Sequence, residues 1–167
     1  MRSAYFAGGC FWCITPTFKL LDGVSEVVSG YSGGDEVNPS YEDVKKQRTQ
    51  HRETIRIDYD PDRVSYDKLL EIFLNSVDPF DGGGQFIDRG RSYTLAVYYE
   101  RDEERDLAQS RVAALEKAAR EKAYIAIEPF KAFYAAEEYH QNYYLKNPEA
   151  FAREMVESGR RKGEDMQ

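Results

Sequence analysis

The chain is poor in several features that define whole classes of proteins. Its 167 residues include only two cysteines, two histidines and one tryptophan. Two cysteines are too few for the disulfide framework that stabilises small secreted domains. No apolar run approaches the roughly 18 residues that a membrane-spanning helix needs. The N-terminal residues lack the sustained apolar stretch of a secretory signal peptide. We therefore expect a cytoplasmic protein without a membrane partner.

Basic charge is also in short supply. Lysine and arginine number 23 against 30 aspartates and glutamates, which gives a formal net charge of −7. Nonspecific binding of nucleic acid needs a basic surface, so this balance argues against a nucleic-acid partner. The sequence also lacks internal repeats and low-complexity linkers, and its hydrophobic share of 41% suffices for a buried core. We expect a single domain over residues 1–167, acting as a monomer, with a mobile charged tail at about 159–167.

Hydrophobic periodicity divides the chain into strands and helices. Strands are predicted at 5–6, 24–31, 54–59, 93–99 and 124–127, and helices at 16–21, 65–77, 102–122, 137–145 and 148–158. Up to residue 99 the order is strand, helix, strand, strand, helix, strand. This is the order of the split βαβ, ferredoxin-like arrangement. We therefore predict an α+β fold in which helices pack on one sheet, with long functional loops at 32–52 and 78–92.

Both cysteines and the only tryptophan fall within GGCFWC, residues 8–13. Cys10 follows a predicted strand at a helix start, where the helix dipole and free N–H groups favour a thiolate. Three interpretations fit Cys10 and Cys13: a dithiol redox site, a metal site shared with His51 and His140, or two buried core residues. The histidines lack the spacing of a zinc motif, and we favour redox chemistry without a metal or other cofactor. We predict that both histidines are structural hydrogen-bonding residues.

Five segments of the sequence resemble one known family. The segments are GCFW after the first strand, GYSGGDEVNPSYEDV at 30–44, QHRE at 50–53, DPFDGGGQFIDRGRSY at 78–93, and EYHQ followed by KNP at 138–148. Together, and in this order, they resemble the peptide methionine sulfoxide reductase A (MsrA) family, here with a Cys-Phe-Trp-Cys arrangement. One such match would be weak, whereas five in order are specific.

The resemblance implies a catalytic role for four side chains. Cys10 matches the family's nucleophile, which attacks the sulfoxide sulfur. Glu53 matches the essential acid, which needs a raised pKa in order to donate a proton. Tyr41 and Tyr93 match the two tyrosines that hydrogen-bond the sulfoxide oxygen and stabilise charge there.

Substrate contacts and a reaction sequence are implied in the same way. Phe11 and Trp12 match the aromatic wall around the substrate methyl group, and Asp88 matches the aspartate that orients the substrate's backbone amide. The implied reaction reduces methionine S-sulfoxide, free or in proteins, and leaves Cys10 as a sulfenic acid. Cys13 then condenses with Cys10 to a disulfide, and thioredoxin or another dithiol reductant restores both thiols.

The sequence departs from the family pattern at a few positions. Thr15 stands where most members have glutamate, and Gln50 replaces a glycine. Phe80 stands where threonine is common. Ser92 and Thr94 flank Tyr93 where the family has Gln-Tyr-Arg. We expect these changes to affect local packing, loop geometry and rate rather than the chemistry.

Two other functional classes remain open at this point. A generic thiol–disulfide oxidoreductase would use Cys10 and Cys13 but would not need Glu53, Tyr41 or Tyr93. A binding protein would recognise oxidised methionine without turning it over.

Overall fold

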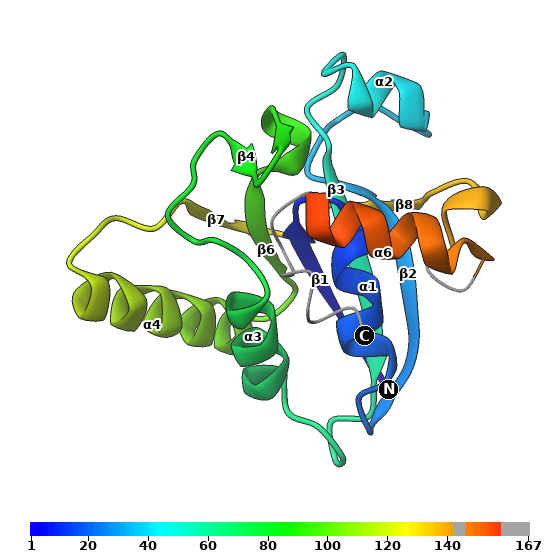
Figure 1. Cartoon of the computed structure of the whole chain (residues 1–167). Helices are drawn as coiled ribbons and strands as arrows, with labels where there is room; N and C mark the ends of the chain where they lie inside the picture. Colours follow the sequence, from blue (N-terminus) through cyan, green and yellow to red (C-terminus); the bar gives the residue numbers. More distant parts are fainter. Residues whose placement is uncertain (142–145, 158–167) are drawn as a thin grey trace.

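The computed structural model describes residues 1–141 and 146–157 (Figure 1). The predicted tail at 159–167, the end of the helix predicted at 137–145 and the last residue of the helix predicted at 148–158 lie outside these residues. The strands are β1 (Arg2–Gly8), β2 (Val24–Ser32), β3 (Arg52–Tyr59), β4 (Gly84–Gln85), β5 (Asp88–Arg89), β6 (Leu95–Tyr99), β7 (Ile125–Pro129) and β8 (Phe133–Ala135). The α-helices are α1 (Phe11–Lys19), α2 (Tyr41–Lys45), α3 (Tyr66–Asn75), α4 (Asp102–Ala119) and α6 (Pro148–Glu157), and two 3₁₀ turns are η1 (Arg91–Tyr93) and η2 (Glu138–His140).

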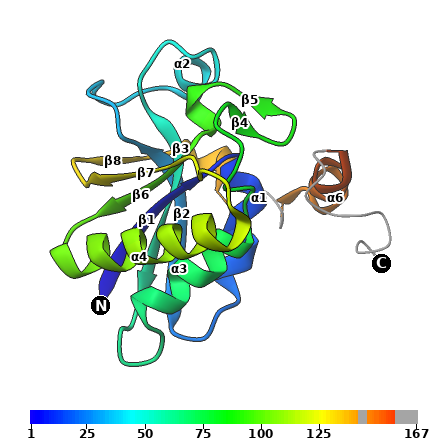
Figure 2. The same cartoon turned by 90° about the vertical axis from the view of Figure 1, so that its left-hand side faces the viewer.

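Six of the strands form one sheet in the order β7-β6-β1-β3-β2-β8, and β4 and β5 form a separate hairpin. β1 is antiparallel to both β3 and β6, and β2 is antiparallel to β3 and β8. β7 is parallel to β6. β1 and β2 therefore run in the same direction with β3 between them, and α1, α3 and α4 lie against this sheet (Figures 1 and 2). The predicted mixture of strands and helices around one sheet is confirmed.

The alternation of side chains along the strands explains how the sheet is buried. Ile55, Ile57 and Tyr59 on β3 are fully buried against α1 and α3, whereas Arg56 and Asp58 are only partly buried. This is the alternation that the sequence predicted. β6 differs from β3: its residues Leu95–Tyr98 are buried on both faces, which accounts for its continuous apolar run. The largest core cluster lies on the helix side, and its members include Phe6, Phe18, Leu69, Leu70, Phe73, Leu95 and Val97.

The first helix begins earlier than predicted. α1 starts at Phe11, not at Pro16, and Pro16 lies inside it. Phe11, Ile14 and Phe18 form a stripe along one helix face, and each is at most 1% exposed. Proline inside a helix removes one backbone hydrogen bond, and burial of this stripe outweighs that loss.

Other differences concern short elements that have no room for a periodic pattern. The predicted strand at 93–99 begins at Leu95, because Tyr93 closes the 3₁₀ turn η1. The predicted loop at 32–52 contains α2, and the one at 78–92 contains the β4–β5 hairpin. β8 was not predicted, and the start of the helix predicted at 137–145 is the turn η2. None of the helices in the described part of the chain is both long and apolar enough to cross a membrane.

Candidate active site

The predicted site residues lie at one end of the sheet, where several strands begin or end. Gly8 at the end of β1 pairs with Leu95 at the start of β6. Glu53 near the start of β3 pairs with Tyr31 near the end of β2. Antiparallel pairing therefore brings the turn after β1, the start of β3 and the segment before β6 to the same end of the sheet. α2 and the β4–β5 hairpin extend from this end (Figure 1).

Cys10 and Cys13 occupy the first turn of α1. Cys10 is the N-cap residue, and the backbone N–H of Cys13 donates to its carbonyl oxygen at 3.1 Å. Neither forms a disulfide; they are 8% and 5% exposed, and they form a buried cluster with Phe151 of α6. The predicted helix-start position of Cys10 is confirmed, and so is the close approach of the two residues across one turn.

The protonation of Cys10 differs from the sequence-based expectation. A side-chain hydrogen bond with Cys13, followed by burial and the charge of Cys13, raises its pKa well above the usual value for a thiol. The charge of Asp88, and that of Glu53 at pH values where it is ionised, act in the same direction. The helix start alone would favour a thiolate, but these effects outweigh it. Cys10 therefore rests as a thiol.

Glu53 is a buried acid directly beside the thiol turn. Its side chain is 1% exposed, and its Oε1 accepts a hydrogen bond from the backbone N–H of Phe11 at 3.1 Å. Burial raises the pKa of Glu53 to about 8, although the Phe11 N–H and the positive charge of Lys45 oppose the shift. The carboxyl therefore carries a proton at neutral pH, which is the state that a general acid needs.

Two tyrosines and one aspartate complete the polar part of the site. Tyr41 is the first residue of α2 and Tyr93 the last of η1. Burial, and then the charge of Glu53, raises the pKa of both phenols well above the usual value, so both remain hydrogen-bond donors. Asp88 lies on β5, and its charge contributes to the shifts of Glu53 and both tyrosines. The fold thus brings these predicted residues into one neighbourhood.

An aromatic wall stands beside these groups. The ring of Trp12 lies 6.1 Å from the rings of both Phe11 and Tyr41, and Phe11 lies 6.3 Å from Tyr41. Phe11 is 1% exposed, so it supports the wall from behind. Trp12 is only partly buried and presents the accessible face. The two residues predicted to contact the substrate methyl group are therefore together, with Trp12 outermost.

Known proteins share both this sequence pattern and this fold. A family model described as peptide methionine sulfoxide reductase matches residues 2–167. This chain belongs to the peptide methionine sulfoxide reductase family. The peptide methionine sulfoxide reductase MsrA of Bacillus velezensis is 47% identical over 159 residues, which cover 94% of this chain and 90% of the relative.

Solved structures agree with that assignment. Reduced Mxr1 from Saccharomyces cerevisiae aligns with a TM-score of 0.83 at 29% identity, covering 89% of this chain and 86% of Mxr1. Mxr1 in complex with Trx2 aligns with a TM-score of 0.57 at 17% identity, covering 85% and 84%, which shows the fold alone. The chain is an oxidoreductase of the methionine sulfoxide reductase family with the family's mixed α/β fold.

In this methionine sulfoxide reductase, Glu137 is a site residue that the sequence alone did not reveal. Its carboxylate accepts hydrogen bonds from the hydroxyl of Tyr31 at 3.0 Å and from the backbone N–H of Tyr41 at 3.3 Å. Burial alone would raise the pKa of Glu137, but backbone hydrogen bonds and the Tyr31 hydroxyl lower it below the usual range. Glu137 thus connects β2 with the start of α2. Its place directly before the EYHQ segment was the available signal.

The two histidines behave differently from each other. His51 is fully buried and structural, as predicted: its Nδ1 accepts from the backbone N–H of Gly34 at 3.2 Å, and its Nε2 lies 2.7 Å from the carbonyl oxygen of Glu36. The same prediction for His140 is wrong. His140 is 1% exposed, but neither ring nitrogen has a hydrogen-bond partner within residues 1–141 and 146–157.

His140 is held by aromatic rings instead. Its ring centroid lies 4.1 Å from that of Tyr41 and 5.3 Å from that of Trp12, and burial lowers its pKa. It therefore rests as a neutral imidazole behind the aromatic wall of the reductase. The described residues contain no group of three or more His, Cys, Asp or Glu side chains that could hold a metal ion.

Thr15, the departure closest to Cys10, has a satisfied environment. Its side chain is buried, and its hydroxyl donates to the carbonyl oxygen of Phe11 at 2.6 Å and lies 3.3 Å from the Ser29 hydroxyl. Thr15 therefore connects α1 to β2 without a carboxylate. The predicted effect of this departure on local packing stays a prediction.

Proposed function

We propose that this enzyme reduces methionine S-sulfoxide, free or in proteins, through a sulfenic acid on Cys10. The observation that carries this proposal is the state of Glu53. It is a buried carboxyl with a pKa of about 8, hydrogen-bonded to the backbone of the residue that follows Cys10. A proton donor beside a thiol is the combination that sulfoxide reduction requires, because sulfur must be attacked while oxygen is protonated.

The proposed first step converts one thiol and one sulfoxide into one sulfenic acid and one thioether. The Cys10 sulfur attacks the substrate sulfur and forms an S–S bond, while Glu53 gives its proton to the sulfoxide oxygen. That oxygen then bonds to the Cys10 sulfur, and both the substrate S–O bond and the S–S bond break. The oxygen ends on Cys10 as Cys–SOH, methionine leaves, and the proton lost by the Cys10 thiol replaces the one that Glu53 gave. The raised pKa of Cys10 means that this deprotonation belongs to the reaction rather than to the resting enzyme.

Other side chains have positioning and stabilising roles in the proposal. Tyr41 and Tyr93 donate hydrogen bonds to the sulfoxide oxygen as negative charge develops there. Trp12, supported by Phe11, holds the substrate methyl group, and Asp88 orients the backbone amide of the substrate. The shared neighbourhood of these groups supports the assignment.

Recycling is proposed to proceed through the second thiol. The Cys13 thiol condenses with the Cys10 sulfenic acid, which forms the disulfide and releases water. Thioredoxin or another dithiol then reduces that disulfide. The hydrogen bond from the Cys13 backbone N–H to the Cys10 carbonyl oxygen keeps the two residues close, which supports this role of Cys13. The yeast protein Mxr1 has been solved in complex with Trx2. Action as a monomer in the cytoplasm stays a prediction.

We also propose that the central sheet is a ferredoxin-like split βαβ arrangement. The position of β3 between the parallel strands β1 and β2, with β6 on the other side of β1, supports this description. It would make α1 and α3 the two crossover helices.

The stereochemistry of the substrate tests the proposed function. The three substituents on the sulfoxide sulfur must each face a different part of the site. The methyl group faces the aromatic rings, the oxygen faces Glu53 and the tyrosines, and the lone pair is on the side of Cys10. We therefore expect turnover of the S epimer of a methionine sulfoxide peptide with dithiothreitol and no turnover of the R epimer, measured as methionine formed. Comparable rates on both epimers, or no turnover of either, would contradict the proposal and favour a generic oxidoreductase or a binding protein.

A further inference from the structure

Tyr93 is flanked by two residues that are both tied to the segment before Glu53. On one side, the Gln47 side-chain amide donates to the Ser92 hydroxyl at 2.7 Å, and its carbonyl oxygen accepts from the Ser92 backbone N–H at 3.0 Å. Gly90 makes room for this side chain, because a Cβ there would lie 2.7 Å from the Gln47 amide carbon. One amide group thus fixes the backbone immediately before Tyr93.

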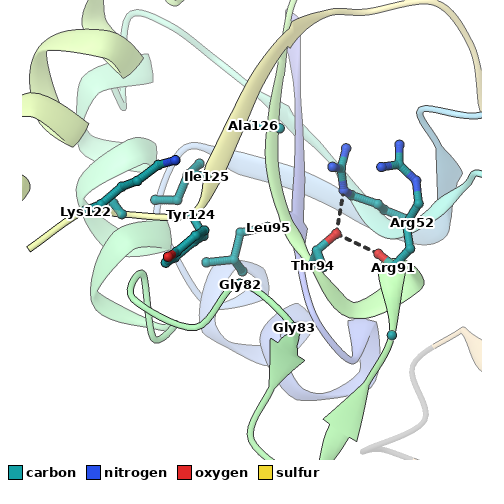
Figure 3. A pocket seen from close by; sticks show the side chains of 12 residues that line it. Arg52, Gly82, Gly83, Arg91, Thr94, Leu95, Lys122, Tyr124, Ile125 and Ala126 are labelled. Carbon is teal, nitrogen blue, oxygen red and sulfur yellow. Dashed lines mark hydrogen bonds between the residues drawn. The ribbon is translucent and has the colours of Figure 1, made fainter.

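Arg52 fixes the other side of Tyr93. Its Nε donates to the Thr94 hydroxyl at 2.8 Å, and Thr94 in turn donates to the carbonyl oxygen of Arg91 at 2.6 Å (Figure 3). The Nη1 of Arg52 donates to the Tyr98 hydroxyl at 3.0 Å and to Glu128 at 2.9 Å. With three partners and 6% exposure, the guanidinium has a single well-defined position.

The placement of these contacts connects two proposed catalytic groups. Arg52 directly precedes Glu53 on β3, so their side chains lie on opposite faces of the sheet. Thr94 directly follows Tyr93. The hydrogen bond between Arg52 and Thr94 therefore connects the backbone beside Glu53 with the backbone beside Tyr93. The Gln47–Ser92 contact removes the remaining freedom of the turn.

Both neighbours of Tyr93 are thus held from one segment of the chain. The side chains that contact Ser92 and Thr94 are a glutamine and an arginine from residues 47–52. We propose that Gln47 and Arg52 are positioning residues that hold Tyr93 relative to Glu53. This rests on the proposed roles of Glu53 and Tyr93.

A double-mutant cycle tests whether Gln47 acts through Tyr93. Gln47 is exposed, so Gln47→Ala leaves the core intact. We expect it to slow the first turnover without reductant by about 10-fold in the wild-type background and less than about 2-fold in Tyr93→Phe. Arg48→Ala is the matched control, because Arg48 is an exposed neighbour whose ion pair is with Asp43, and it should leave the rate unchanged. An equal effect of Gln47→Ala in both backgrounds would overturn the proposal.

Relocating the guanidinium is the second test. Thr94 and Arg52 line a cavity of about 600 Å³, together with Arg91, Lys122 and Tyr124, so an arginine at 94 has space (Figure 3). Arg52→Ala should lower the first-turnover rate by about 10- to 100-fold. The double variant Arg52→Ala/Thr94→Arg should be about 10-fold faster than Arg52→Ala.

The outcomes separate this inference from the proposed function. If the wild-type enzyme does not reduce the S epimer, the proposed function fails, whatever the variants do. If it does, wild-type rates in both Gln47→Ala and Arg52→Ala would overturn the positioning role alone. Should Arg52→Ala unfold in a thermal melt, the Gln47 cycle decides the question by itself.

Discussion

The sulfur side and the oxygen side of the candidate site are assembled over very different lengths of chain. Cys10, Phe11 and Cys13 lie within one helical turn, and the end of β1 together with the start of α1 is enough to place them. Glu53 and Tyr93, in contrast, come from different elements and meet only because β1 pairs with both β3 and β6.

The difference shows where the site is vulnerable. The sulfur side is a single helical turn, so substitutions that leave α1 packed against the sheet should leave it in place. The oxygen side depends on side-chain contacts between segments, among them Glu137 with Tyr41 and Gln47 with Ser92. The bond from the Phe11 N–H to Glu53 connects the two sides. Substitutions on each side should therefore affect different steps.

Removing the nucleophile should have the largest effect. We expect Cys10→Ser to form no methionine with any reductant, because no other thiolate reaches the substrate sulfur. Cys13→Ser should still release about one methionine per enzyme in a single turnover and leave a dimedone-reactive sulfenic acid on Cys10. Its steady-state rate with thioredoxin should fall sharply. Loss of the burst in Cys13→Ser, or its survival in Cys10→Ser, would reverse the two roles.

Replacing the acid tests the oxygen side. Glu53→Gln keeps the size of the side chain but has no proton to donate, so sulfoxide reduction should slow by about 10²- to 10⁴-fold, the usual contribution of a general acid. Dithiothreitol reduction of a preformed Cys10–Cys13 disulfide should be nearly unchanged, which serves as the internal control. Full sulfoxide reductase activity in Glu53→Gln would favour the generic thiol–disulfide oxidoreductase.

The smallest expected effect concerns stability and pH. In the native state Glu53 keeps its proton up to a pKa of about 8, whereas the unfolded chain loses it near 4.5. Between these values the native state binds more protons, so its stability falls as pH rises. Glu53→Gln should remove this pH dependence. Between pH 4 and pH 9 the free energy of unfolding of the variant should therefore rise relative to that of wild type by up to a few kcal/mol, measured by urea unfolding. If the free energies of unfolding of the two proteins changed with pH in parallel, Glu53 would not be held protonated by the fold.

The same contrast separates what the sequence could predict from what it could not. The alternation of β3 and the Ser65 cap of α3, which accepts the Lys68 N–H at 3.0 Å, are local patterns and were predicted. The grouping of Cys10 and Cys13 was local as well. The start of α1 at Phe11 depended instead on burial against the sheet, and the turn that holds Tyr93 depended on Gln47.

The chemistry of buried groups was the hardest part to predict. The neutral state of Cys10 comes from its hydrogen bond with Cys13 and from burial, and Asp88 from a distant segment adds to it. The aromatic surroundings of His140 likewise include Trp12 and Tyr41 from distant segments. Motif resemblance brought these residues to attention, but it did not predict their protonation.

The resting state of Cys10 has a consequence for the survival of the enzyme during oxidative stress. Peroxide and similar oxidants react with thiolates far faster than with thiols. A Cys10 that stays protonated and buried in a cluster with Cys13 and Phe151 should therefore react slowly with them. The resting enzyme is in this way expected to withstand the oxidants that damage methionine.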